Sequence, residues 1–247
     1  MKKINIKIAQ ISDSHLLNDS TLTIHGVNPF ERLLRVLEYV KKNRYEIIFF
    51  TGDLANDGNR ESYRQLWDLI KDLENKYCII PGNHDDLHEM LHVLPQSNLF
   101  TIGKNPFFKL NNWYFLYLDT TVQNKNHGYI SELSIKALKN VVKKLKKCNI
   151  CVIMHHHPFN VGVNMVDKYK IINFDSITDL LVDVKLVLYG HVHNDYTEYH
   201  NGKIYSSCPS TCFQFVKDNK INNHLYGFKE YRLSGENIFS NCIWFSE

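Results

Sequence analysis

Apolar and polar residues follow one another along the chain in an order that predicts strands alternating with helices. Residues 4–11 alternate apolar and polar side chains, as a strand with one buried face does. Residues 47–51, 77–80, 151–154 and 186–189 are short apolar runs, which are typical of central strands covered on both faces. The pattern therefore predicts an α/β fold with at least five core strands.

The stretches between these strands predict amphipathic helices. Asn28–Pro29–Phe30–Glu31 has the pattern of an N-cap, a proline at the first helical position and a capping glutamate. Ser131 is expected to cap a later, longer helix, and shorter helical stretches are expected around residues 87–94 and 177–181. The expected buried stripes are Leu33, Leu34, Leu37 and Val40 in the first helix, Tyr63, Leu66, Trp67 and Ile70 in the second, and Ala137, Leu138, Val141, Val142 and Leu145 after Ser131.

Turn residues predict that antiparallel strands are added to this core. Residues 107–110 and 113–118 flank Asn111–Asn112 and are expected to form a hairpin. From Tyr196 onward, Asn201–Gly202 is a type I′ turn signal and Ser234–Gly235 is a second hairpin signal. The simplest fold is a single domain over residues 1–247, with two sheets packed together and helices outside.

Five of the predicted strands end in side chains that can bind metal ions or transfer protons. An Asn-His pair after a strand is usually only a turn. Here, however, the pattern is repeated at five strand ends, and the ends of such strands meet in one crevice of an α/β fold. The five segments are Asp13–Ser14–His15, Gly52–Asp53, Pro81–Gly82–Asn83–His84–Asp85, His155–His156–His157 and Gly190–His191–Val192–His193.

The residue types in these segments predict a centre with two metal ions. Imidazole and carboxylate ligands without cysteine favour iron, manganese, zinc or cobalt. Asp53 stands alone at its strand end, so we expect it to bridge the ions, which would lie about 3.5 to 4 Å apart and hold a water whose pKa falls towards about 7. That water would attack a phosphoester. We assign Asp13, His15, Asp53 and His193 to one ion, and Asp53, Asn83, His155 and His191 to the other.

Charge and cysteine content narrow the expected partners and location. The 247 residues have a net charge of +3, which does not favour binding to nucleic acid or to an anionic membrane.

Cys148 and Cys151 have the spacing of redox or zinc motifs, but we expect Cys148 to end a helix, where thiolate is disfavoured, and Cys151 to be a small buried residue. Met1–Lys2–Lys3 is followed by alternating residues rather than by the apolar run of a signal peptide. A cytoplasmic protein with reduced thiols is expected.

The ordered motifs D-x-H, G-D, G-N-H-D, H-H-x-P and G-H-x-H resemble those of the calcineurin-like metallophosphoesterase superfamily. Within it, the chain is similar to the bacterial class III cyclic nucleotide phosphodiesterases. That similarity rests on Gly26–Val27–Asn28, on His155–His156–His157–Pro158, and on Pro209–Ser210–Thr211–Cys212 followed by Gln214–Phe215. The resemblance spans residues 8–215.

The resemblance implies a four-layer α/β/β/α sandwich, with two mixed sheets flanked by helices, and hydrolysis of 3′,5′-cyclic AMP to AMP. It implies iron or manganese first, with zinc or cobalt as alternatives, and the same seven ligands. It also implies that His84 is the proton donor to the leaving group. We expect the substrate to be a small cyclic nucleotide and the chain to be a monomer or homodimer. The residues expected to contact substrate are His15, Asp53, Asn83, His84 and His193.

Other activities on the same scaffold stay open at this point. The main alternative is a broader phosphodiesterase or phosphatase acting on 2′,3′-cyclic nucleotides or other diesters. Pyrophosphatase relatives would carry arginine in place of His84, and a nuclease would be expected to bring extra domains and a basic face. A non-catalytic scaffold protein would have lost ligands, yet all seven are present. His156 and His157 are expected beside the ligands, His25, His88, His92, His127, His200 and His224 on the surface, and residues 217–224 in a solvated loop.

Overall fold

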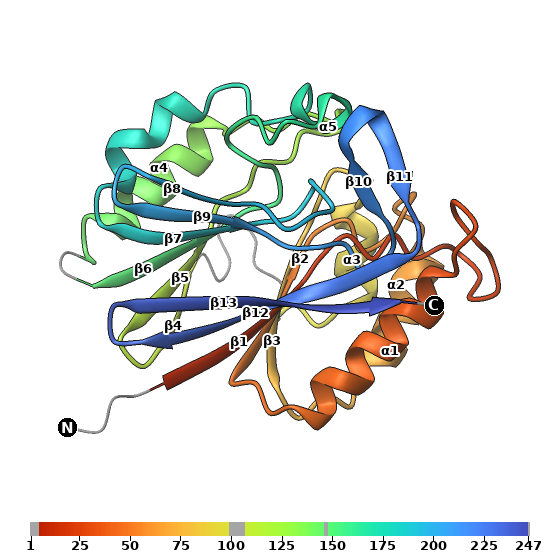
Figure 1. Cartoon of the computed structure of the whole chain (residues 1–247). Helices are drawn as coiled ribbons and strands as arrows, with labels where there is room; N and C mark the ends of the chain where they lie inside the picture. The colour runs from red at the N-terminus through yellow and green to blue at the C-terminus, as the bar shows by residue number, and fades with distance from the viewer. Residues whose placement is uncertain (1–4, 99–106, 146–147, 247) are drawn as a thin grey trace.

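The computed structural model describes residues 5–98, 107–145 and 148–246. The start of the first predicted strand at Ile4, and the segment Met1–Lys2–Lys3, lie outside the described residues. The elements, shown in Figure 1, are β1 (Asn5–Ile11), α1 (Pro29–Lys42), β2 (Ile47–Thr51), α2 (Arg60–Ile70), β3 (Lys76–Ile80), α3 (Leu87–Val93), β4 (Phe107–Leu110), β5 (Trp113–Tyr117), α4 (Glu132–Val142), β6 (Asn149–Ile153), α5 (Asn164–Asp167), η1 (Phe174–Leu181), β7 (Val184–Tyr189), β8 (Thr197–His200), β9 (Lys203–Ser207), β10 (Gln214–Val216), η2 (Lys217–Asn219), β11 (Lys220–Asn222), β12 (Leu225–Ser234) and β13 (Asn237–Ser246).

The strands form two large mixed sheets and one small hairpin. One sheet has the order β13-β12-β1-β2-β3, and the other has the order β4-β5-β6-β7-β9-β8. Strands β1, β2 and β3 are parallel neighbours in the first sheet, as are β6 and β7 in the second. The five predicted core strands are therefore confirmed, and their carboxyl ends lie at the same end of the two sheets.

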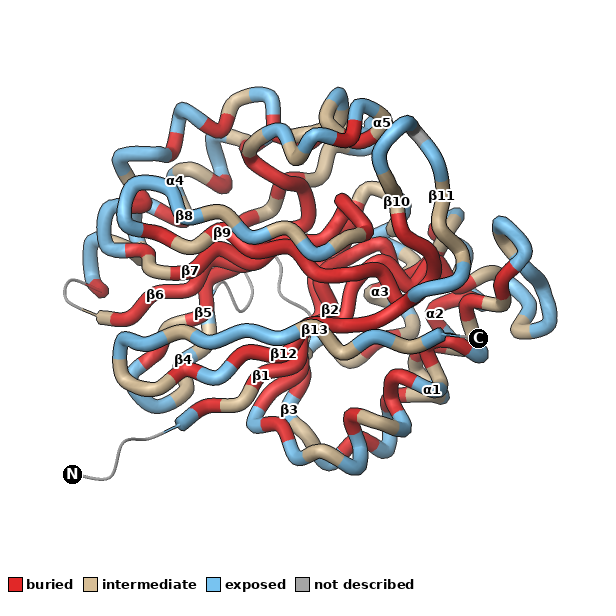
Figure 2. Tube along the Cα trace, viewed as in Figure 1, coloured by how far each residue is buried: buried red, intermediate tan, exposed pale blue. Residues whose placement is uncertain are grey.

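The two sheets pack face to face, with helices on their outer faces. Side chains such as Ile8 and Phe49 from one sheet meet Phe115 and Leu188 from the other in a shared apolar cluster. Buried residues are concentrated in the strands of the two sheets (Figure 2). The predicted four-layer α/β/β/α sandwich is confirmed.

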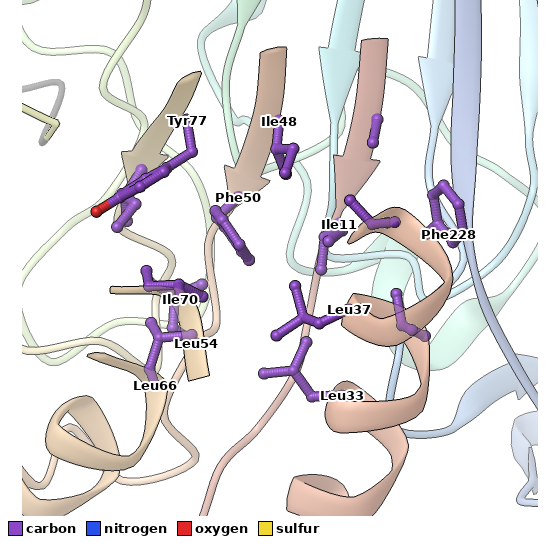
Figure 3. Close-up of a cluster of buried hydrophobic side chains, with 14 of the residues drawn as sticks. Ile11, Leu33, Leu37, Ile48, Phe50, Leu54, Leu66, Ile70, Tyr77 and Phe228 are labelled. Carbon is purple, nitrogen blue, oxygen red and sulfur yellow. The ribbon is translucent and has the colours of Figure 1, made fainter. Parts of the chain in front are cut away.

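A second apolar cluster joins the first sheet to α1 and α2, and a third joins the other sheet to α4 and η1. Figure 3 shows side chains of both helices pointing toward strand residues, namely Leu33, Leu37, Leu66 and Ile70 toward Ile11, Ile48 and Phe50. The predicted N-cap of α1 is present, because the Asn28 side chain accepts a hydrogen bond from the Glu31 N–H at 3.0 Å. Ser131 caps α4 in the same way.

Some details of the sequence-based prediction are wrong. Leu34 is only half-buried, whereas Arg32 and Val36 are buried on the inner face of α1. Helix α4 ends at Val142, so Cys148 lies beyond it rather than at its end, and η1 is a 3-10 helix. The segment expected to be a solvated loop at residues 217–224 contains η2 and β11 and pairs with β10. Among the described helices, none is long and apolar enough to cross a membrane.

Candidate metal centre

The structure brings the five predicted segments together at the carboxyl ends of the strands. Asp13 follows β1, Asp53 follows β2 and Asn83 follows β3, whereas His155 and His191 follow β6 and β7 in the opposite sheet. The loops are joined by backbone hydrogen bonds, such as Asp13 N–H to the Gly52 carbonyl at 3.0 Å. One cluster therefore receives side chains from both sheets.

The backbone at this edge is unusual. Asp13, His15, Asp53, His191 and His193 all have positive φ values, between 46° and 67°. Residues other than glycine rarely adopt this left-handed conformation, and it costs free energy that the surrounding structure must supply. Such strained residues concentrate at functional sites. Five of the seven predicted ligands are held in this way.

The first group of candidate ligands contains Asp13, His15, Asp53 and His193, and all four side chains are buried. His15 Nε2 lies 3.0 Å from His193 Nε2, and His193 Nε2 lies 3.4 Å from Asp13 Oδ1. Asp53 Oδ2 lies 3.8 Å from His15 Nε2. One ligand atom from each residue lies within 4.8 Å of the others, which suits a single ion.

The second group faces the other oxygen of Asp53. His155 Nε2 lies 3.4 Å from Asp53 Oδ1 and 3.1 Å from Asn83 Oδ1. The His191 ring lies 5.3 Å from the His155 ring, and His191 Nε2 is buried without a hydrogen-bond partner. The two carboxylate oxygens of Asp53 thus face different groups, as a bridging ligand requires.

His156 belongs to the same buried cluster, but its ring nitrogens are already engaged. Its Nε2 lies 3.2 Å from the Asn126 carbonyl, and its Nδ1 lies 2.9 Å from the Thr120 hydroxyl. An Nε2–H that donates to Asn126 leaves Nδ1 to accept from Thr120, so no lone pair is free for a metal ion. His157 stacks on His191 at 5.4 Å, and its Nε2 lies 3.6 Å from Asp167 Oδ1. Both residues lie beside the candidate ligands, where they were expected.

Hydrogen bonds on the far side of the imidazole rings fix which nitrogen can bind a metal ion. His155 Nδ1 lies 2.8 Å from the Thr51 carbonyl, and His193 Nδ1 lies 2.9 Å from the Phe213 carbonyl. Because a carbonyl can only accept, each Nδ1 carries the hydrogen, and a neutral ring then presents an Nε2 lone pair. Those lone pairs face carboxylate oxygens, the Asn83 amide oxygen or another Nε2. A cation placed between these nitrogen and oxygen atoms would interact favourably with all of their lone pairs, so this set of ligand atoms fits metal ions.

The pKa values of these buried groups agree with this role. Burial alone would raise the pKa of Asp53, but His155 outweighs burial and holds the pKa well below its usual value. Burial, with the nearby His193, lowers the pKa of His15 to about 3, and burial also lowers that of His191. Burial alone would lower the pKa of His155, but the Asp53 carboxylate outweighs burial and raises this pKa to about 9. The Asp53 carboxylate is therefore anionic, as a ligand of a cation must be.

Several residues that sequence reasoning did not single out shape this site. The Asp85 carboxylate accepts hydrogen bonds from the Leu54, Ala55 and Gly82 N–H groups, and so joins the loops after β2 and β3. Gly82 is required for close approach, because a Cβ there would lie 2.2 Å from Asp53 Oδ1. The G-D and G-N-H-D motifs contained both signals, but only the folded structure shows which atoms they contact.

His84 lies at the rim of the cluster. Its N–H donates to Asp53 Oδ1 at 2.9 Å, and its Nδ1 lies 2.7 Å from the Asn56 carbonyl. The ring packs edge-on to His15 at 4.9 Å. The Nδ1–H therefore donates to Asn56, and the side chain is exposed, which leaves Nε2 free to meet a ligand.

Comparisons with known proteins agree with the fold and identify a family. The sequence model of the calcineurin-like phosphoesterase family matches residues 6–195. A probable cyclic nucleotide phosphodiesterase of Coxiella burnetii is 35% identical over 97% of this chain and 97% of its own length. A 3′,5′-cyclic adenosine monophosphate phosphodiesterase of Haemophilus influenzae is 30% identical over 86% of this chain and 79% of its own length.

Solved structures give the same fold. A dimetal phosphatase from Danio rerio superposes with a TM-score of 0.75 and covers 98% of each chain, at 11% sequence identity. The family match covers most of the sequence, and its range includes all seven candidate ligands described above. This chain belongs to the calcineurin-like phosphoesterase family.

Proposed function

We propose that this chain is a metal-dependent phosphodiesterase that hydrolyses 3′,5′-cyclic AMP to 5′-AMP. The names of the relatives from Coxiella burnetii and Haemophilus influenzae support the cyclic nucleotide substrate. The main support from the structure is the convergence of imidazole Nε2 atoms and carboxylate oxygens at the ends of both sheets. That donor set suits the cations that bind and polarise a phosphodiester.

Two ions would be held by the two groups of residues that share Asp53. Asp13, His15 and His193 would complete one site, and Asn83, His155 and His191 the other. Iron and manganese suit these ligands best, with zinc or cobalt as alternatives. When bound, such ions act as Lewis acids on the phosphoryl oxygens and lower the pKa of water.

His84 would protonate the leaving group. Hydrolysis adds water to phosphorus and breaks the bond to the ribose 3′ oxygen, which leaves poorly unless it receives a proton. With Nδ1–H bound to the Asn56 carbonyl and the ring packed against His15, Nε2 of His84 is the atom left to donate the proton. General acid catalysis of this kind contributes about 10²- to 10⁴-fold in rate. His15, Asp53, Asn83 and His193 would lie against the phosphate.

The test of this proposal compares substrates in the purified, metal-loaded enzyme. Cyclic AMP, cyclic GMP, 2′,3′-cyclic AMP and bis(p-nitrophenyl) phosphate are assayed side by side, and cyclic AMP should have the highest kcat/KM. A kcat/KM for cyclic AMP no higher than for the generic diester would instead favour the alternative of a broad phosphodiesterase.

The His84→Ala variant tests the proton donor separately. It should keep both ions, lose about 10²-fold or more in kcat on cyclic AMP, and lose much less on bis(p-nitrophenyl) phosphate, whose p-nitrophenolate leaves without a proton. Equal losses on the two substrates would contradict the role of proton donor. His88→Ala, at an exposed histidine on α3, is the control and should change neither rate.

We also propose that residues 1–247 form one domain that acts on a small molecule in the cytoplasm, as a monomer or homodimer. The shared apolar cluster between the sheets supports a single domain. All six cysteines are free thiols, which suits a reducing compartment. Burial raises the pKa of Cys151 well above its usual value, so this thiol is inert. The net charge of +3 does not favour nucleic acid or a membrane surface.

A further inference from the structure

An apolar slot of about 280 Å³ opens directly beside the candidate metal ligands. One wall comes from the segment before α1 and from the β10–β11 hairpin, and the facing wall comes from α5 and the residues after it. His15 and His193 line its inner end, so a ligand bound at the cluster would extend into it. The apolar and aromatic lining residues are Ile24, Phe213, Phe215 and Ile221 on one side, and Met165, Val166 and Tyr169 on the other.

The aromatic wall begins at the metal cluster itself. The Phe215 ring lies 4.4 Å from the ring of His193, and the Phe213 ring lies 4.7 Å from it. His25 is exposed, as expected from the sequence, and its ring packs edge-on to Phe213 at 4.7 Å. A group one ribose away from a phosphate at the cluster would therefore meet ring faces rather than water.

One buried side chain holds the base of the hairpin that carries this wall, where the chain enters β10 and where it leaves β11. Arg32 of α1 is 1% exposed, and its guanidinium donates to the Cys212 carbonyl just before β10 and to the Asn223 carbonyl just after β11. At the other end of the hairpin, η2 contacts α5, and Figure 1 shows β10 and α5 side by side. The slot is therefore preformed between two anchored elements.

The charge of the lining limits what the slot can take. No lysine or arginine is among the described residues that line it, so a second phosphate would find no cationic partner there. The polar groove on the other side of His84, of about 400 Å³, carries Asp57 and Asp86 and is less suited to an apolar ring. The slot favours a flat, uncharged heterocycle.

We propose that this slot is the nucleobase subsite, with Phe215 and Ile221 as the residues that stack on the base and Arg32 as the residue that positions their hairpin. The inference rests on the proposed cyclic nucleotide substrate and adds where that substrate's base lies. Phe215 and Ile221 are opposite each other in the β10–β11 register, so they present one continuous surface.

The test separates base recognition from hydrolysis of the phosphodiester. Phe215→Ala and Ile221→Ala are assayed on cyclic AMP and on the base-free ribose 3′,5′-cyclic phosphate. Because stacking on an aromatic side chain contributes a few kcal/mol per base, the ratio of the two kcat/KM values should fall about 5- to 150-fold in Phe215→Ala, mainly through KM for cyclic AMP. Phe239→Ala, at an exposed phenylalanine of β13, is the matched control and should keep the wild-type ratio.

A binding measurement supplies a readout besides activity. Calorimetric titration with AMP and with ribose 5-phosphate should show that the wild type prefers AMP and that Phe215→Ala loses most of that preference. An unchanged ratio in both hairpin variants, or a loss of preference in Gln123→Ala of the polar groove instead, would overturn the inference. If the wild type did not turn over cyclic AMP at all, the proposed function would fail first, independently of the hairpin variants.

Discussion

Arg32 provides the sharpest test of how this molecule is held together, because one side chain joins a helix to both ends of a distant hairpin. Its two terminal guanidinium nitrogens donate to two different backbone carbonyls, those of Cys212 and Asn223, and the guanidinium lies over the Tyr226 ring at 4.6 Å. A lysine at this position keeps the charge but cannot donate in both directions in one plane. The informative substitutions are therefore Arg32→Lys and Arg32→Met.

The structure sets the size of the expected effects. A hydrogen bond from a charged donor contributes about 1.5–3 kcal/mol, and a buried cation over an aromatic ring contributes about 0.5–2 kcal/mol. Arg32→Lys loses one bond and part of the stacking, so the free energy of unfolding should fall by about 2 kcal/mol. Arg32→Met loses both hydrogen bonds and leaves the buried Cys212 carbonyl without a donor. The Asn223 carbonyl lies in a half-exposed segment, so it can accept a hydrogen bond from water instead. A loss of about 3–4 kcal/mol is expected.

Urea denaturation measures the global effect, and limited trypsin digestion measures the local one. Lys217 and Lys220 are exposed near the tip of the hairpin, so a loosened hairpin should be cleaved there faster under native conditions. Arg64→Lys is the matched control, since Arg64 is exposed and forms a surface ion pair with Glu61 three residues earlier. This substitution should change stability by less than about 0.5 kcal/mol. Unfolding free energies of both Arg32 variants within about 0.5 kcal/mol of wild type, with unchanged cleavage, would refute the reasoning.

Two further substitutions test the metal centre. Gly82→Ala places a Cβ 2.2 Å from Asp53 Oδ1 and should weaken the binding of both ions by about 10- to 100-fold. Gly227→Ala on β12 places a Cβ 2.4 Å from the Ile243 carbonyl oxygen on β13, so it should lower stability but leave metal affinity intact. Competition with a chelator measures the metal affinity of both variants. Asp53→Ala should remove both ions, because the two oxygens of Asp53 face different groups of candidate ligands. Asp57→Ala, which changes an exposed neighbouring carboxylate, is the control and should remove neither ion. If elemental analysis still found two ions bound to Asp53→Ala, Asp53 would not be a bridging ligand.

The core strands and the candidate ligands could be predicted from the sequence because both leave strong local signals. A buried strand is a short apolar run, and a ligand at its end is a histidine, aspartate or asparagine that has no packing reason to be there. The parallel arrangement of β1, β2 and β3 then brings Asp13, Asp53 and Asn83 together, and the packing of the second sheet adds the histidines after β6 and β7. The type I′ turn at Asn201–Gly202 was equally local, and both residues do have positive φ.

Residues whose role depends on a distant partner could not be predicted in this way. Arg32 lies among the leucines of α1 and was given no role from the sequence, because its partners are at Cys212 and Asn223, about 180 and 190 residues away in the chain. Asp85 was given no role of its own from the sequence, yet it accepts hydrogen bonds from the loops after β2 and β3. The hairpin at β10 and β11 is short and half polar, so its pattern resembled that of a loop.

The same contrast separates the metal side of the site from the base side. Metal ligands must be particular atoms, whereas a stacking wall needs only apolar area, which every core strand also has, so residue type alone does not reveal it. In the structure the two sides meet at Phe213 and Phe215. Their carbonyls accept hydrogen bonds from His193 Nδ1 and from the Asn194 side chain, while their rings line the slot. Because the backbone orients the candidate ligands and the side chains form the wall, substitutions at these two positions can change which base is held without moving His193.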